Sequence, residues 1–315
     1  MTPNSKAAIT IDMGGTTLKI GIVHQGKIVT VHKQPASSRA SLESILNELV
    51  PVINDLIRQT SIVPYGIGIA FPGIVDSPNK RILSDYVKYP NAKDIDLTDW
   101  AVTHWNIPLA IENDARAALV GEWQYGAGKS SNDLVLITLG TGFGSAVIMD
   151  GRLVRGRNYL AGNLGGHMTI NLDGRVCNCG NIGCLETESS GWALKDLVES
   201  SPVFPSSTLA RQEEINFQTL FQQAKIGDSL ANKLVHHSLK AWALGIINLI
   251  HAYDPEKVIV GGGIMHNSEI IIPYVKHMEQ KHSWSKNNNV SIVAAEQIEF
   301  AALLGMDYLL TSYTH

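Results

Sequence analysis

A strand, a glycine turn and a second strand occur twice in this chain, and this repeat constrains the fold more than any other feature. The first copy, AAITIDMGGTTLKIGIV, has an apolar run that ends at Asp12 and is followed by a GGTT turn. The second copy, DLVLITLGTGFGSAVIM, carries the turn GTGFG. A further short turn follows each copy, QG after the first and DG after the second. Each copy therefore predicts a β-hairpin, and the pair predicts a duplicated unit.

Both glycine turns suit the binding of phosphate. Glycine lets backbone N–H groups approach anionic oxygens, and threonine hydroxyls add donors. The Asp12 carboxylate could hold Mg²⁺ or one of its waters, while Lys19 either faces the phosphates or is solvated, the commoner state of a strand lysine. Ordinary hairpin turns are the structural alternative, and only the pair, with an acid before the first, favours a nucleotide clamp. Neither turn has the P-loop or dinucleotide-binding pattern. The remaining candidate nucleotide-binding residues of the two turns are Gly14, Gly15, Thr16, Thr17, Gly140, Thr141 and Gly142.

A third glycine stretch follows a short β-branched run. The segment PEKVIVGGGIM predicts a strand over 257–260, followed by Gly261, Gly262 and Gly263. Bare glycines after a strand let an adenine or ribose lie against the backbone. A plain strand-to-helix turn explains them equally well.

A carboxylate stands at a predicted strand end in IPLAIENDARAALVGEW. The pattern predicts a strand over 107–112 and a helix from about Asp114. Helix capping is one role for Asn113 or Asp114. Catalysis is the other, because the carboxyl ends of strands in α/β sheets face the ligand crevice. Asp114 could accept a proton from a hydroxyl that attacks ATP, and the residues alone leave both roles open.

The three cysteines of the chain fall within eight positions, and a histidine lies just upstream of them. Their pattern, His-x9-Cys-x-Cys-x4-Cys, offers four ligands to a tetrahedral zinc and leaves no open position, so it predicts a structural zinc. Gly180 and Gly183 permit the tight backbone that such a loop requires. Three free buried thiols are the alternative, but the segment CNCGNIGC is polar. The predicted ligands are His167, Cys177, Cys179 and Cys184.

Composition excludes several classes of protein. The chain has 315 residues, of which 44% are apolar and 17% charged, which allows a sizeable core. Its formal net charge is −4, without runs of Lys and Arg, which argues against a nucleic-acid surface. No apolar run is long enough to span a membrane, and MTPNSKAAITIDMGG has no basic-then-apolar leader. Clustered cysteines suit a reducing compartment, so we expect a cytoplasmic protein.

In motif order the chain resembles the ROK family of repressors, open reading frames and kinases. The resemblance includes DMGGTTLKIGIV, GIGIAFPGIVD, ENDARAALVGE, LGTGFGSAVIMDGRLVRG, AGNLGGH, CNCGNIGCLETESS and VIVGGGI. It implies an α/β, actin-like ATPase (ribonuclease H-like) fold of two lobes with duplicated hairpin phosphate motifs. We expect a first lobe over residues 1–116, completed by a C-terminal helix over about 296–315. The second lobe, with the zinc loop, is expected over 117–295.

The resemblance also implies a function and site roles. The expected activity is an ATP-dependent hexose kinase, a phosphotransferase with an alcohol acceptor, acting on the 6-hydroxyl of a sugar such as glucose. Asp114 is the implied base, and Asn113, Asp114 and Glu186 are implied to hold sugar hydroxyls. His167 is implied to contact the sugar and ligate the zinc. The expected cofactors are ATP, Mg²⁺ and a structural Zn²⁺, and a homodimer is expected by analogy.

One departure from the family pattern concerns the sugar. Kinases of the family carry AGE-x-GH, where this chain has AGNLGGH. Aligned from the left, Asn163 takes the glutamate position; aligned from the right, Leu164 does. We prefer Asn163, because an amide can still bond two hydroxyls. The missing carboxylate leaves glucose, an N-acetylhexosamine, fructose and allose open as substrates.

Two other functions compete with a kinase. Sugar-sensing repressors of the family carry a DNA-binding domain before the first phosphate motif, and 11 residues precede Asp12 here, too few for three helices. A non-catalytic sugar-binding protein is the second alternative. The presence of Asp12, Asp114 and both glycine turns favours the kinase.

Overall fold

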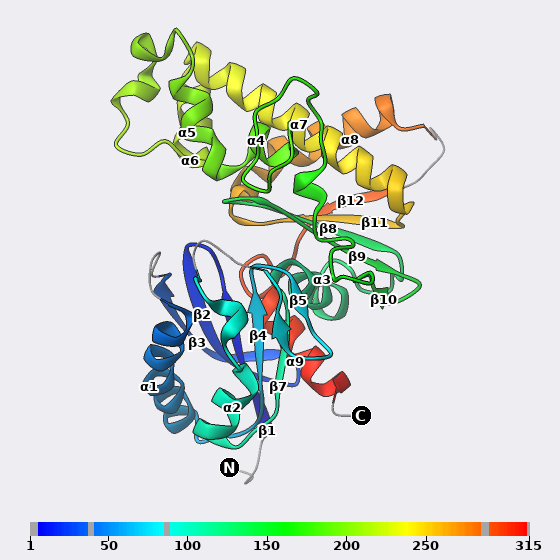
Figure 1. The fold of residues 1–315 in the computed structure, drawn as a ribbon. Coiled ribbons are helices and arrows are strands. Elements are labelled where there is room, and N and C mark those ends of the chain that lie inside the picture. The colour runs from blue at the N-terminus through cyan, green and yellow to red at the C-terminus, as the bar shows by residue number, and fades with distance from the viewer. Residues whose placement is uncertain (1–5, 37–40, 85–88, 285–289, 314–315) are drawn as a thin grey trace. The chain divides into compact units, whose positions relative to one another are not determined.

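The chain forms two compact units, which are drawn in Figure 1. The computed structural model describes residues 6–36, 41–84, 89–284 and 290–313. Unit 1 comprises residues 1–130, 155–161 and 299–315, and unit 2 comprises residues 131–154 and 162–298. The chain therefore leaves unit 1 and returns to it twice.

Unit 1 is built on a mixed sheet of five strands in the order β3-β2-β1-β4-β7. The pairs β1–β2 and β2–β3 are antiparallel, whereas β1–β4 and β4–β7 are parallel. Gln25 and Gly26 have positive φ values of 50° and 70° in the turn after β2, as a two-residue hairpin of right-handed twist requires. The first predicted hairpin is confirmed. The strands of this unit are β1 (Lys6–Met13), β2 (Thr17–His24), β3 (Lys27–Pro35), β4 (Val63–Phe71), β5 (Val75–Asp76), β6 (Arg81–Ile82) and β7 (Leu109–Asn113).

The two faces of this sheet pack differently because alternate residues of a strand point to opposite sides. On β4, Ile67 and Ile69 belong to the hydrophobic cluster that includes α1 and α2. Gly66 and Gly68 face α9, where a Cβ on Gly68 would lie 2.8 Å from Met306 Cβ. The bulky residues of β4 thus pack against α1 and α2, whereas its glycines allow α9 to lie close to the strands. The helices of unit 1 are α1 (Leu42–Thr60), α2 (Leu97–Trp105), α3 (Asp114–Tyr125) and α9 (Ala301–Tyr313).

Unit 2 repeats the architecture of unit 1. Its sheet has the order β10-β9-β8-β11-β12, with antiparallel pairs β8–β9 and β9–β10 and parallel pairs β8–β11 and β11–β12. Asp150 and Gly151 have φ values of 50° and 68°, in the same turn geometry as the first hairpin. The predicted duplication is confirmed. The strands are β8 (Leu134–Leu139), β9 (Phe143–Met149), β10 (Arg152–Leu153), β11 (Lys257–Gly261) and β12 (Ser291–Ala294).

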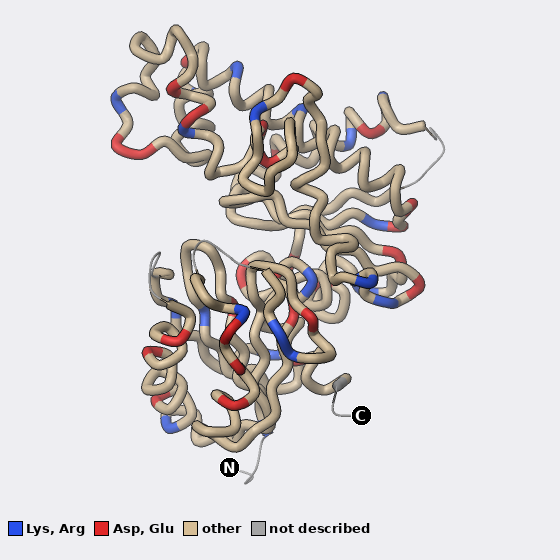
Figure 2. The backbone as a smooth tube through the Cα atoms, in the orientation of Figure 1, with Lys and Arg blue, Asp and Glu red and all other residues tan. Residues whose placement is uncertain are grey.

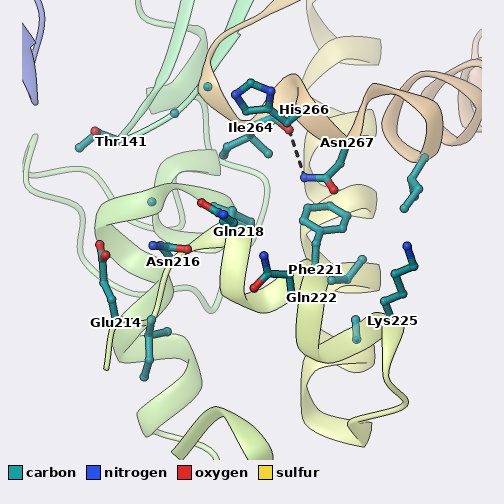
Figure 3. Close-up of a pocket in the computed structure, with 18 of the residues that line it drawn as sticks. Thr141, Glu214, Asn216, Gln218, Phe221, Gln222, Lys225, Ile264, His266 and Asn267 are labelled. Atoms are coloured by element: carbon teal, nitrogen blue, oxygen red, sulfur yellow. Dashed lines mark hydrogen bonds between the residues drawn. The ribbon is translucent and has the colours of Figure 1, made fainter. Parts of the chain in front are cut away.

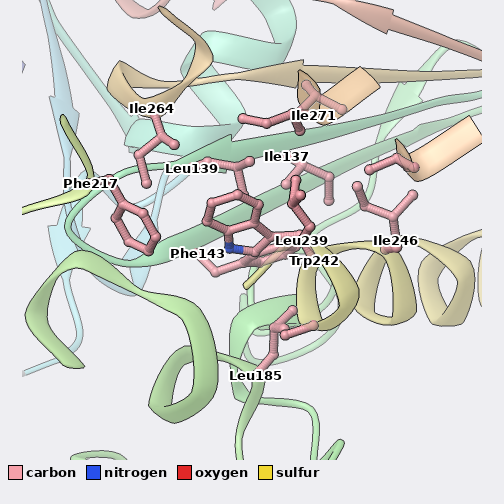
Figure 4. Packing of buried hydrophobic residues seen from close by; sticks show 14 of the residues in the cluster. Ile137, Leu139, Phe143, Leu185, Phe217, Leu239, Trp242, Ile246, Ile264 and Ile271 are labelled. Carbon is pink, nitrogen blue, oxygen red and sulfur yellow. The ribbon is translucent and has the colours of Figure 1, made fainter. Parts of the chain in front are cut away.

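The core of unit 2 lies between this sheet and its helices, and Trp242 of α7 is at its centre (Figure 4). Trp242 is 1% exposed, and its ring centroid lies 5.2 Å from that of Phe217. Its indole N–H donates to Ser189 O at 2.9 Å, so no polar group of this side chain is left unpaired. The helices of unit 2 are α4 (Leu185–Ser189), α5 (Gly191–Glu199), α6 (Phe217–Lys225), α7 (Ser229–Tyr253) and α8 (Ser268–His282).

Two segments differ from their predicted limits. The C-terminal helix begins at Ala301 rather than at about residue 296, because residues 296–300 form a bend and a turn. Residues 314 and 315 lie outside the described part. The first segment of unit 1 continues to Ser130, beyond the predicted limit at residue 116, because α3 packs on α9 within that unit.

Charged side chains are dispersed over both units. In Figure 2 the segments coloured for Lys and Arg and those coloured for Asp and Glu are scattered over many elements of both units. None of the described helices has the length and the apolar character that a membrane crossing needs.

Candidate active site

The first glycine turn connects β1 and β2 in unit 1. A Cβ on Gly14 would lie 2.6 Å from Thr17 O, so only glycine allows this tight turn. The hydroxyl of the fully buried Tyr89 donates to Gly14 O at 3.3 Å and so stabilises the turn. The backbone that precedes Gly15 and Thr16 is therefore held in place.

Asp12 and Lys19 form an ion pair across the β1–β2 hairpin, at a Cα-paired position of the two strands. Lys19 Nζ lies 3.0 Å from Asp12 Oδ2 and donates to Glu299 O at 3.0 Å. Oδ1 of Asp12 accepts no hydrogen bond from the residues that the structure describes. Lys19 is thus paired rather than simply solvated, and it orients the carboxylate of Asp12.

Asn113 caps helix α3 and also links it to a neighbouring turn. Its Oδ1 accepts from Arg116 N at 3.2 Å, and its Nδ2 donates to Gly73 O and to Asp114 Oδ1, both at 3.0 Å. Gly73 belongs to the Pro-Gly turn after β4. All hydrogen-bonding positions of the Asn113 amide except its second lone pair are therefore used to fix the end of β7.

Asp114 is the first residue of α3 and has one engaged and one open carboxylate oxygen. Oδ1 accepts from Ala115 N at 2.8 Å and from Asn113, whereas Oδ2 receives no donor within the described chain. Burial raises the pKa of Asp114 to about 7, and the nearby charge of Asp12 adds to this rise, while hydrogen bonds from the backbone N–H groups of Ala115 and Asp114 and from the Asn113 amide oppose it. A carboxyl group with this pKa is suited to accept a proton near neutral pH.

A buried charge network holds the residues around Asp114, and the sequence did not reveal it. Glu112 and Arg116 are fully buried, with Oε1 of Glu112 3.7 Å from Arg116 Nη1. Oε1 also accepts from Asn113 N, and Oε2 accepts from Arg155 Nε and Nη2 at 2.9 and 2.7 Å. Arg116 Nη2 donates to the carbonyl oxygens of Tyr159 and Ala161. Glu112 lies in β7 and Arg116 in α3, so their i,i+4 spacing was no helical pairing signal, and nothing near Arg155 signalled its ion pair with Glu112.

Unit 2 contains a pocket of about 1180 Å³, part of which is shown in Figure 3. Its lining includes Gly140 and Thr141 from the second glycine turn and Gly263 after β11. Helix α6 contributes Phe217 and Phe221 to its apolar part. Carboxamides surround this part: the lining contains Asn216, Gln218, Gln222, Asn232 and Asn267. An apolar pocket with a few polar groups is typical of small-molecule sites.

The three consecutive glycines at the end of β11 have different structural surroundings. Gly262 has φ of +94°, and a Cβ there would lie 2.3 Å from Leu139 O. A Cβ on Gly261 would meet Ala295 at 3.1 Å, whereas one on Gly263 would meet nothing within 4 Å. Gly263 alone of the three lines the pocket, while the other two allow the close approach of strand and turn.

The second glycine turn is held by α4 and α5. Gly140 O and Thr141 O accept from the backbone N–H groups of Gly191 and Trp192, both at 3.0 Å. Oε1 of Glu186 accepts from Phe143 N at 2.8 Å. These bonds fix the turn, and they place Glu186 directly beside it.

The predicted zinc ligands come together in unit 2. His167, Cys177, Cys179 and Cys184 each offer one ligand atom, and these atoms lie within 4.8 Å of one another. The distances Cys177 Sγ–His167 Nδ1 and Cys179 Sγ–Cys184 Sγ are both 3.7 Å. Ligand atoms around a tetrahedral zinc are roughly 3.5–3.8 Å apart, so these two pairs have that spacing, and the four donors are of the type that zinc binds.

Glycines shape the loop that carries these ligands. Gly180 and Gly183 have φ values of +90° and +63°, as predicted, and a Cβ on Gly183 would lie 1.6 Å from Asn171 O. The loop runs directly into α4, where Glu186 lies two residues after Cys184. The metal-ligand loop and the Glu186 side chain therefore belong to one continuous segment of the chain.

Asn163 lies in a turn that is clamped on both sides. Ser145 Oγ donates to Gly162 O at 2.7 Å and accepts from Gly165 N at 2.9 Å. Oδ1 of Asn163 is buried and accepts no hydrogen bond from the described residues. An unpaired buried acceptor is costly and marks a place where a bound donor would be favourable.

Comparison with known proteins assigns the chain to a family. Residues 8–312 match the model of the ROK family. The glucokinase of Thermotoga maritima is 31% identical over 304 residues, which cover 94% of this chain and 95% of that protein. The xylose repressor of Caldicellulosiruptor bescii is 29% identical over 272 residues, which cover 84% of this chain and 67% of that protein.

A solved structure gives the same result for the fold. The ROK family glucokinase from Streptomyces griseus, in complex with glucose and AMPPNP, has a TM-score of 0.80 and 27% identity, with 96% of this chain and 98% of that chain covered. The duplicated mixed sheets agree with the predicted actin-like fold. Since the family model extends over nearly the whole sequence, the chain belongs to the ROK family.

Proposed function

We propose that this protein is an ATP-dependent hexose kinase that transfers the γ-phosphoryl group to the 6-hydroxyl of a sugar such as glucose. The observation that carries the proposal is Asp114, whose pKa of about 7 and open Oδ2 suit a general base at the end of a strand. The similarity to glucokinases supports the same activity. Phosphoryl transfer requires positioning, charge neutralisation and one such base.

The chain's own residues divide the work of the reaction. Oδ2 of Asp114 accepts the hydroxyl proton, and Asn113 holds the base in position through its bond to Oδ1. The open Oδ1 of Asp12 suits Mg²⁺, which prefers few carboxylates, and the ion would neutralise phosphate charge. Each glycine turn is proposed to bind phosphate oxygens, with Thr16 and Thr17 in unit 1 and Thr141 in unit 2, and the pocket of unit 2 beside Gly263 is proposed to bind the nucleoside.

The zinc-ligand cluster would hold a structural ion. Its four donors complete a tetrahedral shell, so no position remains for a substrate. His167 and Glu186 lie on the segment that the ion would stiffen, and both are proposed to contact the sugar. Loss of the metal would therefore weaken sugar binding without removing the base.

Asn163 is proposed to take the place of the family's glutamate. Its unpaired Oδ1 supports this assignment over Leu164, because a sugar hydroxyl or amide N–H would satisfy that oxygen. A neutral acceptor instead of a carboxylate changes the pocket near C1 and C2 of the sugar. Glucose, N-acetylhexosamines, fructose and allose are the sugars to compare.

A coupled ADP-release assay with Mg²⁺-ATP and a panel of these sugars tests the proposal. Turnover with one sugar, lost in Asp114→Asn, is the expected result. Sugar-dependent thermal stabilisation without ADP release from any sugar would instead favour a sensor, as in the repressors of the family. A cytoplasmic homodimer is proposed by analogy with the family, and light scattering of the purified protein tests the dimer.

A further inference from the structure

Trp192 contacts two functional parts of unit 2. It is the second residue of α5, and it lines the pocket proposed for the nucleoside. Its indole N–H donates to Oε2 of Glu186 at 3.1 Å. Because Glu186 is proposed to hold sugar hydroxyls, one side chain lies against both substrates' binding residues.

The carboxylate of Glu186 has little freedom to move. Its second oxygen, Oε1, accepts from Phe143 N at 2.8 Å. A Cβ on Gly142 would lie 2.5 Å from Oε1, and a Cβ on Gly166 would lie 2.9 Å from Glu186 Cγ. The carboxylate is therefore packed between the second glycine turn and the start of the metal-ligand loop, and the donor on Oε2 decides its remaining orientation.

The backbone of Trp192 is tied to the same glycine turn. Its N–H donates to Thr141 O, and the preceding Gly191 N donates to Gly140 O, both at 3.0 Å. A Cβ on Gly191 would lie 2.9 Å from Gly140 O, which shows how closely α5 approaches the turn. With the backbone fixed, a ligand in the pocket acts on Trp192 through its indole side chain.

We propose that Trp192 is a positioning residue that couples nucleotide binding to sugar binding. A nucleotide packed against the indole holds its N–H on Oε2 of Glu186, so the carboxylate is already oriented when the sugar arrives. Sugar affinity then rises when nucleotide is bound, and nucleotide affinity rises by the same factor when sugar is bound. This inference deepens the proposed function and rests on it.

The test compares wild type with Trp192→Phe, which keeps an aromatic ring but removes the N–H donor. Trp284→Phe is the matched control, because Trp284 is 93% exposed in the same unit. Calorimetry measures the Kd of the preferred sugar with and without the Mg²⁺ complex of β,γ-imido-ATP. We expect the analogue to tighten sugar binding about tenfold in wild type and in the control, and less than about twofold in Trp192→Phe.

Steady-state kinetics give a second readout. Trp192→Phe should raise the sugar KM at saturating ATP and the ATP KM at saturating sugar by the same factor, about tenfold, while kcat stays within about threefold of wild type. Weaker binding of each ligand when it is measured alone, together with a lowered Tm, would show a merely structural role. Glu186→Gln provides a second variant, because it weakens the acceptor of the indole N–H while every residue of α5 stays unchanged. It should also abolish the coupling.

The outcomes separate this inference from the proposed function. Coupling that persists in Trp192→Phe, or that is absent in wild type, overturns the role of Trp192 while ADP release shows that the kinase stands. Absence of ADP release from wild type with every sugar refutes the proposed function itself.

Discussion

Asn113 and Asp114 show that a capping residue and a catalytic candidate can occupy adjacent positions without conflict. Asn113 Oδ1 caps α3, and its Nδ2 fixes one oxygen of Asp114, which leaves Oδ2 open. Both roles considered from the sequence are therefore compatible with one geometry. The sequence could not show the raised pKa, because that depends on burial and on Asp12, which lies on another strand.

Replacing Asp114 by Asn tests its role as the base. The substitution keeps the size of the side chain but removes proton acceptance, so kcat should fall by about two to four orders of magnitude. Sugar Kd should change little. The exposed Asp99→Asn in the same unit is the control. Turnover of Asp114→Asn within tenfold of wild type would exclude Asp114 as the general base.

The pH dependence of activity follows from the same carboxyl group. The base must be unprotonated, so kcat/KM should rise with pH and level off above a pKa of about 7. Because the folded-state pKa lies above the ordinary value, the charged group costs stability as pH rises from about 4 to about 7. Asp114→Asn should therefore raise Tm at pH 8, but not at pH 4, by calorimetry. A kcat/KM that stays level on acidification and falls only near about pH 4 would show an ordinary carboxyl pKa and would contradict the burial of Asp114.

At the scale of elements, the hairpins, the strand before α3 and the start of α3 were predictable, because turn residues, apolar runs and capping residues are local signals. The crossing of α3 and α9 was not, because it depends on glycines far apart in sequence. A Cβ on Gly121 would lie 1.9 Å from Ala301 O, and one on Gly305 would lie 1.8 Å from Ala117 O. The two backbones thus touch where each helix has its glycine.

Gly305→Ala tests this crossing, because its expected effect on the free energy of unfolding is opposite to that of the same substitution in an ordinary helix. In an ordinary helix, replacing Gly by Ala stabilises by about 1 kcal/mol. Here the methyl group would overlap Ala117 O, so the free energy of unfolding should fall by about 1–3 kcal/mol. Ser312→Ala, at an exposed position of α9, is the control in denaturant titrations. A more stable Gly305→Ala protein would refute the close contact.

Cys179→Ser tests the metal-ligand loop as an element. Removing one of the four donors leaves the zinc with an incomplete set of ligands. The zinc content of the purified protein, measured by elemental mass spectrometry, should therefore drop from about one ion per chain to well below about half an ion per chain. The sugar KM should rise, because Glu186 follows the loop directly. Asn178→Ser, exposed and adjacent, is the matched control. Full zinc content in Cys179→Ser, with an unchanged sugar KM, would contradict the site.

At the scale of the whole molecule, the duplication was predictable from two similar glycine turns, and the sheet orders of the two units agree with it. The return of the chain to unit 1 at residues 155–161 was not predictable from the sequence. Residues 155–161 belong to unit 1, between two segments of unit 2. They are held there by Arg155 on Glu112 and by carbonyl oxygens on Arg116, contacts between residues about 40 positions apart. Such buried pairing has no local sequence signature.

Separate cores predict that a mutation in one core destabilises one unit and not the other. The two main hydrophobic clusters share no residue, and each lies within one unit. Hydrogen exchange measured by mass spectrometry on the full chain should therefore resolve them. Mg²⁺ with β,γ-imido-ATP alone should slow exchange in peptides from α6 and from residues 263–270, which line the pocket. Gly305→Ala should instead speed exchange in β1, β4 and α3, and leave α7 and β11 unchanged. Faster exchange of Gly305→Ala in both units to the same extent would mean that the chain unfolds as a single cooperative body.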